Sequence, residues 1–101
     1  MPRPAIDFHP EAVAEARAAR AWYEARSPAA AEAFVVEVDR AIERILDDPD
    51  RPPVYMLGTR AVLLRRFPYL VVFRRTETGV QVIAIAHGRR RPGYWRSRAR
   101  Q

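Results

Sequence analysis

Two helical sequence patterns, separated by a joint of only two or three residues, place the strongest constraint on the fold. The pattern over residues 28–47 repeats apolar side chains at helical spacing, so that they make one stripe. The members of this stripe are Ala31, Phe34, Val38, Ile42 and Ile45. The pattern over residues 10–26 has the same spacing, with Glu15 among the polar residues free to face water. So short a joint predicts an antiparallel helix hairpin, whose apolar face the remaining chain must cover.

Proline residues mark where these helices begin and end. Pro10 suits a first helical position because its missing N–H would have no partner inside the helix, and His9 before it is expected to have a structural role. Ser27 is a suitable N-cap for the second helix, with Pro28 next to it. Pro49 disfavours helical backbone at the residue before it and therefore ends the second helix.

Apolar segments outside the helices indicate strands that cover the hairpin. A short alternating run over residues 5–8 predicts an edge strand, and longer runs predict strands over residues 60–67, 69–75 and 80–87. Pro68 and a glycine-containing loop separate the last three strands. The strand residues expected to receive the helix stripe are Val71, Phe73, Val82 and Ala84.

The order of these elements predicts an α+β fold in a single domain of residues 1–101. An N-terminal strand precedes the antiparallel helix hairpin. A three-strand antiparallel meander then completes one sheet and leads into a basic C-terminal tail. Trp22 and Tyr23 are expected to pack between the hairpin and the sheet, and Tyr69 is expected to share the core with Phe73.

The composition excludes several classes of site. Cysteine is absent, which removes disulfides and thiolate chemistry, and the two histidines lie far apart in sequence. We therefore expect no metal and no cofactor. The N-terminus lacks the apolar region of a signal peptide, and no segment is long and apolar enough to span a bilayer. These features predict a cytoplasmic protein with no membrane partner.

Positive charge is concentrated in the C-terminal part of the chain. Residues 60–101 hold eleven arginines and one acidic residue, a formal charge of +10, whereas residues 1–59 carry −4. Such asymmetry predicts a positive face and an anionic partner. The arginines that could bind a target or an acidic protein are Arg65, Arg66, Arg89, Arg90, Arg91 and Arg96. In a regular strand Arg65 and Arg66 point to opposite faces, so at most one of them joins the patch.

Several short segments follow one another along the chain in a characteristic order. They are Phe8-His9-Pro10-Glu11-Ala12, Trp22-Tyr23, Ala33-Phe34, Val38-Asp39-Arg40-Ala41-Ile42, the stretch from Leu64 to Arg74, and Ile85-Ala86-His87-Gly88-Arg89-Arg90. In this order they resemble the RelE/ParE superfamily of type II toxin–antitoxin toxins, over nearly the whole chain. The resemblance implies a small cytoplasmic toxin and a cognate antitoxin that wraps and neutralises it. That partner is expected to be acidic and partly disordered when free.

The resemblance implies one of two targets. RelE-like members cut mRNA on the ribosome, and ParE-like members poison DNA gyrase without known hydrolytic chemistry. The nuclease pattern has basic residues in the second strand and an arginine early in the third, where this chain has Ala61, Leu63 and Leu70. These departures favour a ParE-like gyrase inhibitor, with a RelE-like ribosome-dependent mRNA interferase as the alternative. A small basic nucleic-acid-binding module is a third option, but it leaves the helix hairpin unexplained.

The catalytic candidates, if the chain is RelE-like, are His87, Arg89 and Tyr94. The resemblance places Arg89 and Tyr94 at late positions of the nuclease pattern. His87 precedes three arginines, whose charge favours a neutral ring that could act as a base. Alternatively, His87 is a strand-end histidine whose ring hydrogen-bonds the backbone. Tyr94 and Trp95 either stack on a nucleotide base or pack on the sheet, and we expect Trp95 to pack on the sheet.

Overall fold

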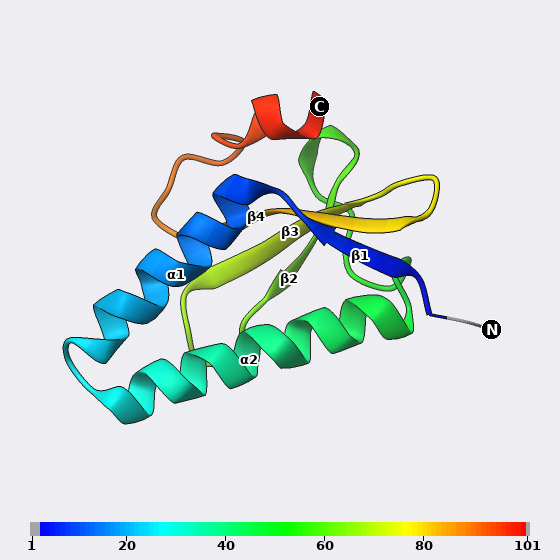
Figure 1. Cartoon of the computed structure of the whole chain (residues 1–101). Helices are drawn as coiled ribbons and strands as arrows, with labels where there is room; N and C mark the ends of the chain where they lie inside the picture. The colour runs from blue at the N-terminus through cyan, green and yellow to red at the C-terminus, as the bar shows by residue number, and fades with distance from the viewer. Residues whose placement is uncertain (1–2, 101) are drawn as a thin grey trace.

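A pair of helices lies along one face of a four-stranded sheet in the computed structural model, which describes residues 3–100 (Figure 1). The α+β order predicted from the sequence is confirmed. The elements are β1 (Ala5–Phe8), α1 (Pro10–Glu24), α2 (Pro28–Asp47), β2 (Arg60–Leu63), β3 (Tyr69–Arg75) and β4 (Gly79–His87), with short 3-10 turns η1 (Met56–Gly58) and η2 (Arg96–Arg100). The α1 helix ends two residues before the predicted boundary.

The strand order in the sheet is β1-β4-β3-β2. The last three strands form the predicted antiparallel meander. The first strand lies at an edge, as predicted, and pairs in parallel with β4, from Ala5 opposite Gly79 to Phe8 opposite Val82. The sheet is therefore mixed, and its two edge strands are β1 and β2.

Side-chain caps fix the start of both helices. The backbone N–H of Glu11 donates to Nδ1 of His9 over 3.1 Å, and that of Ala30 donates to Oγ of Ser27 over 3.2 Å. These bonds satisfy N–H groups that have no partner within the first helical turn. The structural role predicted for His9 and the N-cap predicted for Ser27 are thus confirmed.

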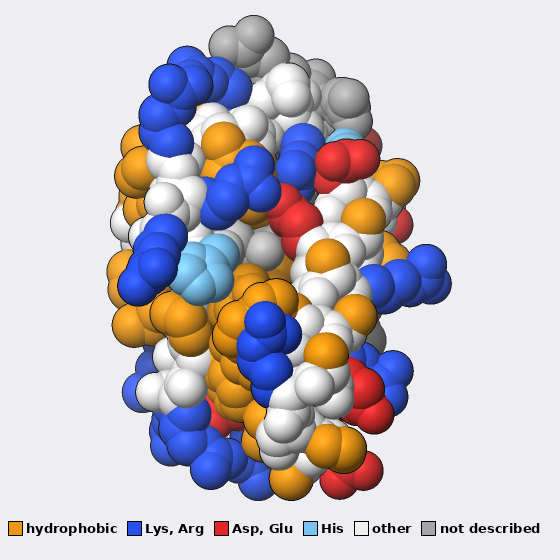
Figure 2. Space-filling view, turned by 90° about the vertical axis from the view of Figure 1, so that its left-hand side faces the viewer, with side chains coloured by type: hydrophobic (Ala, Val, Ile, Leu, Met, Phe, Trp, Pro, Cys, Tyr) orange, Lys and Arg blue, Asp and Glu red, His pale blue; other side chains and the backbone are white. Residues whose placement is uncertain are grey.

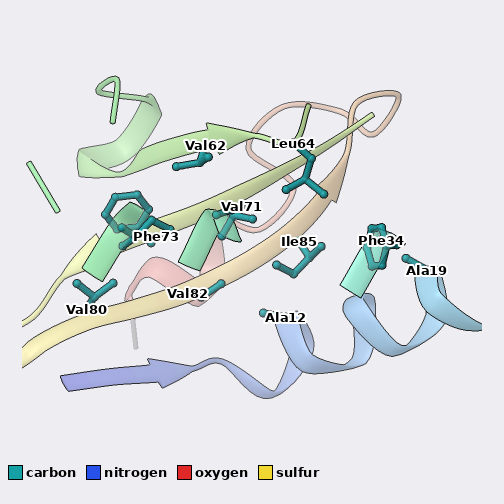
Figure 3. Close-up of a cluster of buried hydrophobic side chains, with 12 residues drawn as sticks. Ala12, Ala19, Phe34, Val62, Leu64, Val71, Phe73, Val80, Val82 and Ile85 are labelled. Carbon is teal, nitrogen blue, oxygen red and sulfur yellow. The ribbon is translucent and has the colours of Figure 1, made fainter. Parts of the chain in front are cut away.

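The main core lies between the helices and the sheet (Figure 3). Phe34 and Ile45 of the helix stripe are buried against Val71, Phe73 and Val82, as predicted. Val38 and Tyr69 are partly buried at the edge of the same cluster. Tyr23 joins it by stacking edge-on against Phe67 at a centroid distance of 5.0 Å.

The expectation that Ala84 faces the helices is wrong, because a β-bulge changes the alternation of β4. Val72 pairs with Ala84 while Phe73 pairs with Val82, so Ile83 is an extra residue in β4. An extra residue reverses which face the following side chains occupy. Ile83 and Ala84 consequently both lie in a second cluster, on the face away from the helices.

Trp95 covers this second face of the sheet. It is 1% exposed and packs with Val72, Ile83 and Ala84. The expectation that Trp95 anchors the tail by packing is confirmed. A hydrogen bond of 2.6 Å from Nη1 of Arg74 to the carbonyl of Ala99 holds the tail in place beyond Trp95.

Two side chains lie where the sequence patterns did not predict them. Trp22 is 52% exposed instead of packed against the sheet, and the guanidinium of Arg26 stacks on its ring at 3.5 Å. Glu37, which belonged to the polar side of its helix, is 6% exposed. Its carboxylate accepts hydrogen bonds from the backbone N–H groups of Arg65 (2.8 Å) and Arg66 (3.3 Å).

The contact with Glu37 explains why β2 ends at Leu63 and not at residue 67. The backbone donors that would extend the strand are bound to a helix, so Arg65 and Arg66 lie in a turn, and the strand geometry assumed for them is wrong. Hydrogen bonds from the Arg66 side chain and the two backbone groups lower the pKa of Glu37. This anchor is therefore present at neutral pH and is lost as the pH falls through the lowered pKa.

We expect truncation of the buried aromatic side chains to destabilise the fold strongly. Phe34→Ala and Phe73→Ala should each lower the free energy of unfolding by roughly 3–5 kcal/mol, the usual cost of removing a buried phenylalanine. Urea denaturation followed by circular dichroism measures this. Val36→Ala is the control, because Val36 is 43% exposed and should change little. Equal midpoints for Phe34→Ala and Val36→Ala would show that the core is misassigned.

Candidate functional site

Three consecutive arginines, Arg89–Arg91, form the cationic loop that follows β4. Its first turn is held by backbone bonds, from the N–H of Gly88 to the carbonyl of Pro68 (2.7 Å) and from the N–H of Arg90 to that of His87 (3.0 Å). The three arginine side chains are exposed. A fixed backbone with exposed guanidinium groups is suited to binding phosphates or carboxylates.

His87 is bound to the backbone of this loop. Its Nδ1 accepts a hydrogen bond of 3.0 Å from the N–H of Arg89, and its ring lies edge-on to Tyr69 at 5.0 Å. The alternative of a strand-end histidine that bonds the backbone is thus confirmed. Because Nδ1 is the acceptor, the proton of the neutral ring is on Nε2. The other ring nitrogen, Nε2, is then a donor, which disfavours a role as general base.

The hydroxyl of Tyr94 points toward α1 and donates to Oε2 of Glu15 over 2.6 Å. Burial, this hydrogen bond and the negative charge of Glu15 raise the pKa of Tyr94 well above its ordinary value. The guanidinium of Arg90 stacks on the ring at 3.8 Å. Tyr94 therefore connects the cationic loop to α1 and stays protonated at neutral pH.

Glu15, Ile85, Tyr94 and Arg98 make up what we call the Glu15 network. Oε1 of Glu15 accepts from the backbone N–H of Ile85 (3.0 Å) and from Nη1 of Arg98 (2.9 Å), and Oε2 accepts from Nη2 of Arg98 (3.1 Å). Nη1 of Arg98 also donates to the carbonyl of Ile83 over 3.1 Å. One carboxylate thus joins α1, β4 and the tail.

The sequence patterns did not reveal this network. Glu15 was expected to face water, yet its side chain is 15% exposed and that of Arg98 is 10% exposed. Helical spacing describes only the neighbours of Glu15 along α1, and its partner is 83 residues away. No local signal in the sequence indicates such a pair.

The predicted arginines do not all gather in one place. Arg89 and Arg90 line a cleft between α1 and the ends of β3 and β4, whereas Arg65 lines a different groove beside β2. Arg66 forms an ion pair with Glu37 at 3.0 Å. Arg96 is exposed in η2. The structure therefore brings His87 and Tyr94 together with the cationic loop and leaves Arg65 and Arg66 apart from it.

The cleft beside the cationic loop, which we call the aromatic cleft, has a volume of about 620 Å³. Trp22, Tyr23 and Tyr69 contribute aromatic walls, and His87 lies at its rim with Arg89 and Arg90. Figure 2 shows arginine and histidine side chains around an apolar hollow on this side of the molecule. Such a surface is suited to a partner that offers an apolar side chain next to a negative charge.

Two further features bear on the predicted partners. Within residues 3–100, histidine and acidic side chains nowhere gather in a group of three or more that could hold a metal ion. Across the same residues, no helix is both long and apolar enough to cross a membrane.

We expect Glu15 to be essential for holding the tail. Glu15→Ala should lower the free energy of unfolding by about 2–3 kcal/mol, because the buried Arg98 and the half-buried Tyr94 both lose the carboxylate that accepts their hydrogen bonds. In a Trp22→Phe background, acrylamide quenching of Trp95 fluorescence should rise as the tail loosens. The matched control is Glu32→Ala on the exposed side of α2. Equal quenching in both variants contradicts the role given to Glu15.

Comparisons with known proteins agree with this fold. A chain of a solved structure described as "Chromosomal ParDE TA system from P. aeruginosa" is 19% identical and superposes with a TM-score of 0.73, over 84% of this chain and 96% of that one. A comparison with curated protein sequences finds no match. The family model described as "ParE toxin of type II toxin-antitoxin system, parDE" matches residues 6–92, from β1 to just past the cationic loop. The chain therefore belongs to the ParE toxin family of type II toxin–antitoxin systems.

Proposed function

We propose that this ParE-family toxin arrests growth by binding DNA gyrase, without hydrolysing nucleic acid. The observation that carries the proposal is the state of the two candidate proton-transfer groups. Tyr94 donates its hydroxyl proton to Glu15, and His87 uses Nδ1 to accept from the backbone of the cationic loop. General acid–base catalysis needs a group that reaches the reacting atom and exchanges a proton with it. Both side chains are instead suited to holding the loop in place.

The strands beside the site support the same conclusion. Ala61 and Leu63 of β2 and Leu70 of β3 stand where a nuclease of the RelE type would have cations, and Ala61 is 8% exposed. An RNA cleavage site must stabilise the negative charge that develops on the phosphate. Apolar side chains at these positions cannot supply that stabilisation.

The proposed contact surface is the cationic loop together with the aromatic cleft. Exposed arginines give the long-range attraction, and the aromatic walls offer an apolar area that a protein partner can bury. Arg65, Arg66 and Arg96 lie outside this cleft and would act as secondary contacts. A gyrase target also places the toxin in the cytoplasm.

The proposed antitoxin is an acidic protein that is partly disordered when free and covers the cationic loop in the complex. Carboxylates placed on Arg89–Arg91 would form charge-assisted hydrogen bonds and exclude the target from the same arginines. Support comes from family membership and from the similar solved structure, whose description names a toxin–antitoxin system.

One experiment distinguishes the two possible targets. The toxin is induced in cells, and gyrase-dependent plasmid supercoiling is followed beside mRNA integrity. We expect supercoiling to be lost while mRNA stays intact at early times. New mRNA breaks on ribosomes with normal supercoiling would replace the proposal with the mRNA interferase alternative. Induced protein that binds nucleic acid without either effect would favour the small nucleic-acid-binding module.

Substitutions at the site give a second test. His87→Gln and Tyr94→Phe, singly and together, should leave much of the growth arrest in place, because the proposed function requires neither side chain to transfer a proton. Changing Arg89, Arg90 and Arg91 together to Gln should abolish the arrest, because it removes the charge that recognises the target. The readout is growth after induction, with circular dichroism to confirm folding.

The control for the triple change is an equal loss of charge elsewhere on the surface, at Arg17, Arg20 and Arg40, which are exposed on the helices. General acid–base catalysis contributes about 10²–10⁴-fold to a rate. If His87→Gln or Tyr94→Phe alone detoxifies a folded protein, and mRNA cleavage disappears with it, the protein is a ribonuclease.

A further inference from the structure

Exposed positive charge is concentrated in the segment that follows β4, residues 88–97. No acidic residue occurs in the sequence after Glu77. The acidic side chains that contact the tail, Glu11 and Glu15, both approach Arg98, at 3.7 Å and 2.9 Å. The exposed side chains of the segment itself are those of Arg89, Arg90, Arg91, Pro92, Arg96 and Ser97. The surface that this segment presents to solvent is therefore cationic and carries no negative charge of its own.

Three of these residues, Arg89, Arg91 and Arg96, are what we call the unpaired arginines. Within residues 3–100, their side chains form no ion pair and stack on no aromatic ring. Arg90 differs from them, because its guanidinium stacks on Tyr94 at 3.8 Å. An arginine without an internal partner can bind an anion without breaking a contact inside the protein.

The backbone that carries the unpaired arginines is fixed by successive turns. The N–H of Tyr94 donates to the carbonyl of Arg91 over 3.2 Å, and that of Arg96 donates to the carbonyl of Gly93 over 3.0 Å. Trp95, the neighbour of Arg96, is 1% exposed and anchors this part of the tail. The backbone is therefore ordered before a ligand arrives, which lowers the entropy cost of binding.

The surroundings of the unpaired arginines favour phosphate groups over a protein partner. Protein interfaces depend on aromatic and apolar side chains that become buried, and in the described chain no large hydrophobic side chain is exposed within residues 88–97. Arg91 and Arg96 also lie outside the lining of the aromatic cleft. Binding to a phosphate backbone requires only cations placed within reach of the phosphates.

The same segment favours a duplex over a single strand. Proteins that bind single strands stack the bases on exposed aromatic rings, but Trp95 is buried, and Tyr94 is half-buried with Arg90 stacked on its ring. Ser97 is the one exposed side chain of residues 88–97 that is polar and uncharged, so little is available to read base edges or the 2′-hydroxyls of RNA. These features are typical of contact with the backbone alone, without recognition of sequence.

We infer that the unpaired arginines bind the phosphate backbone of duplex DNA. A duplex carries one negative charge per about 1.7 Å of its axis, so phosphates are within reach of each guanidinium along the segment. The contact is electrostatic and independent of sequence. Provided that the proposed function holds, this DNA is the duplex that gyrase holds, and the toxin binds both the protein and the DNA of its target.

Fluorescence anisotropy of a labelled DNA duplex of about 20 base pairs tests the inference with purified protein, at salt concentrations from about 50 to about 200 mM. One variant removes the charge of the unpaired arginines through Arg89→Gln, Arg91→Gln and Arg96→Gln. Its matched control loses the same charge on the exposed faces of the helices, through Arg17→Gln, Arg20→Gln and Arg40→Gln. Thermal unfolding confirms that both variants are folded.

We expect saturable binding that weakens with salt and is equal for two duplexes of different sequence. Each arginine that neutralises a phosphate contributes about 0.9 to the slope of log K against log salt. The variant at the unpaired arginines should therefore have a shallower slope and bind about tenfold more weakly or worse at low salt, whereas the control should keep the slope of the unaltered protein. Lysine at the same three positions should also keep the slope, because lysine neutralises a phosphate as a point charge.

Several results would overturn the inference. Two are the absence of saturable binding and equal slopes in the variant and its control. Tighter binding of a single strand of the same length, or of an RNA duplex of the same sequence, would assign the unpaired arginines to a different nucleic acid. Polyglutamate that displaces the labelled duplex as well as unlabelled duplex does, at equal concentrations of charge, would assign them to an acidic protein.

This inference and the gyrase proposal can fail separately, because duplex binding is measured without gyrase. If the induced toxin leaves supercoiling unchanged while duplex binding depends on the unpaired arginines, the gyrase proposal fails and the inference stands. If supercoiling is lost while the purified toxin does not bind duplex DNA, the gyrase proposal stands and the inference is wrong.

Discussion

The structure depends on the hydrogen bonds that take the place of β1 beside β4 beyond the point where β1 ends. The pairing of β1 ends at Phe8, while β4 continues for five more residues. Beyond that point Arg98 donates to the carbonyl of Ile83 and Glu15 accepts from the N–H of Ile85. The Glu15–Arg98 ion pair gives the backbone of β4 one hydrogen-bond donor and one acceptor, as a neighbouring strand would. Backbone groups left unpaired in the interior are costly, so this pair stabilises the long central strand.

The bulge at Ile83 allows the Glu15–Arg98 pair to bind the backbone of β4 in this way. The extra residue shifts the alternation of β4, so that Ile83 and Ile85 both direct backbone groups to the side where β1 is missing. The same shift turns the side chains of Ile83 and Ala84 toward Trp95. The bulge therefore decides which side chains of β4 face the tail.

The parts of the fold that sequence patterns predicted are those encoded by local periodicity. The helix stripe around Phe34, the cap at Ser27 and the meander follow from spacing and proline positions, and all are present. The bulge is not encoded in any single run of residues. The buried roles of Glu15 and Glu37 depend on partners far along the chain, so helical spacing alone assigned both to solvent. For the candidate site, the sequence predicted the cationic loop from its charge. It did not predict the hydrogen bond from Tyr94 to Glu15 that connects this loop to α1.

The two sides of the sheet are completed by different contacts. An open edge favours unwanted pairing with other chains, and most proteins cover or charge it. On one side, β1 pairs with β4 as far as Phe8, and the Glu15–Arg98 pair then binds the backbone of β4 at Ile83 and Ile85. The β2 edge is closed only as far as Pro53, a residue that cannot donate, and apolar side chains surround the open part. An edge left open beside an exposed leucine is a liability in a lone protein, because it can pair with the edge of another chain.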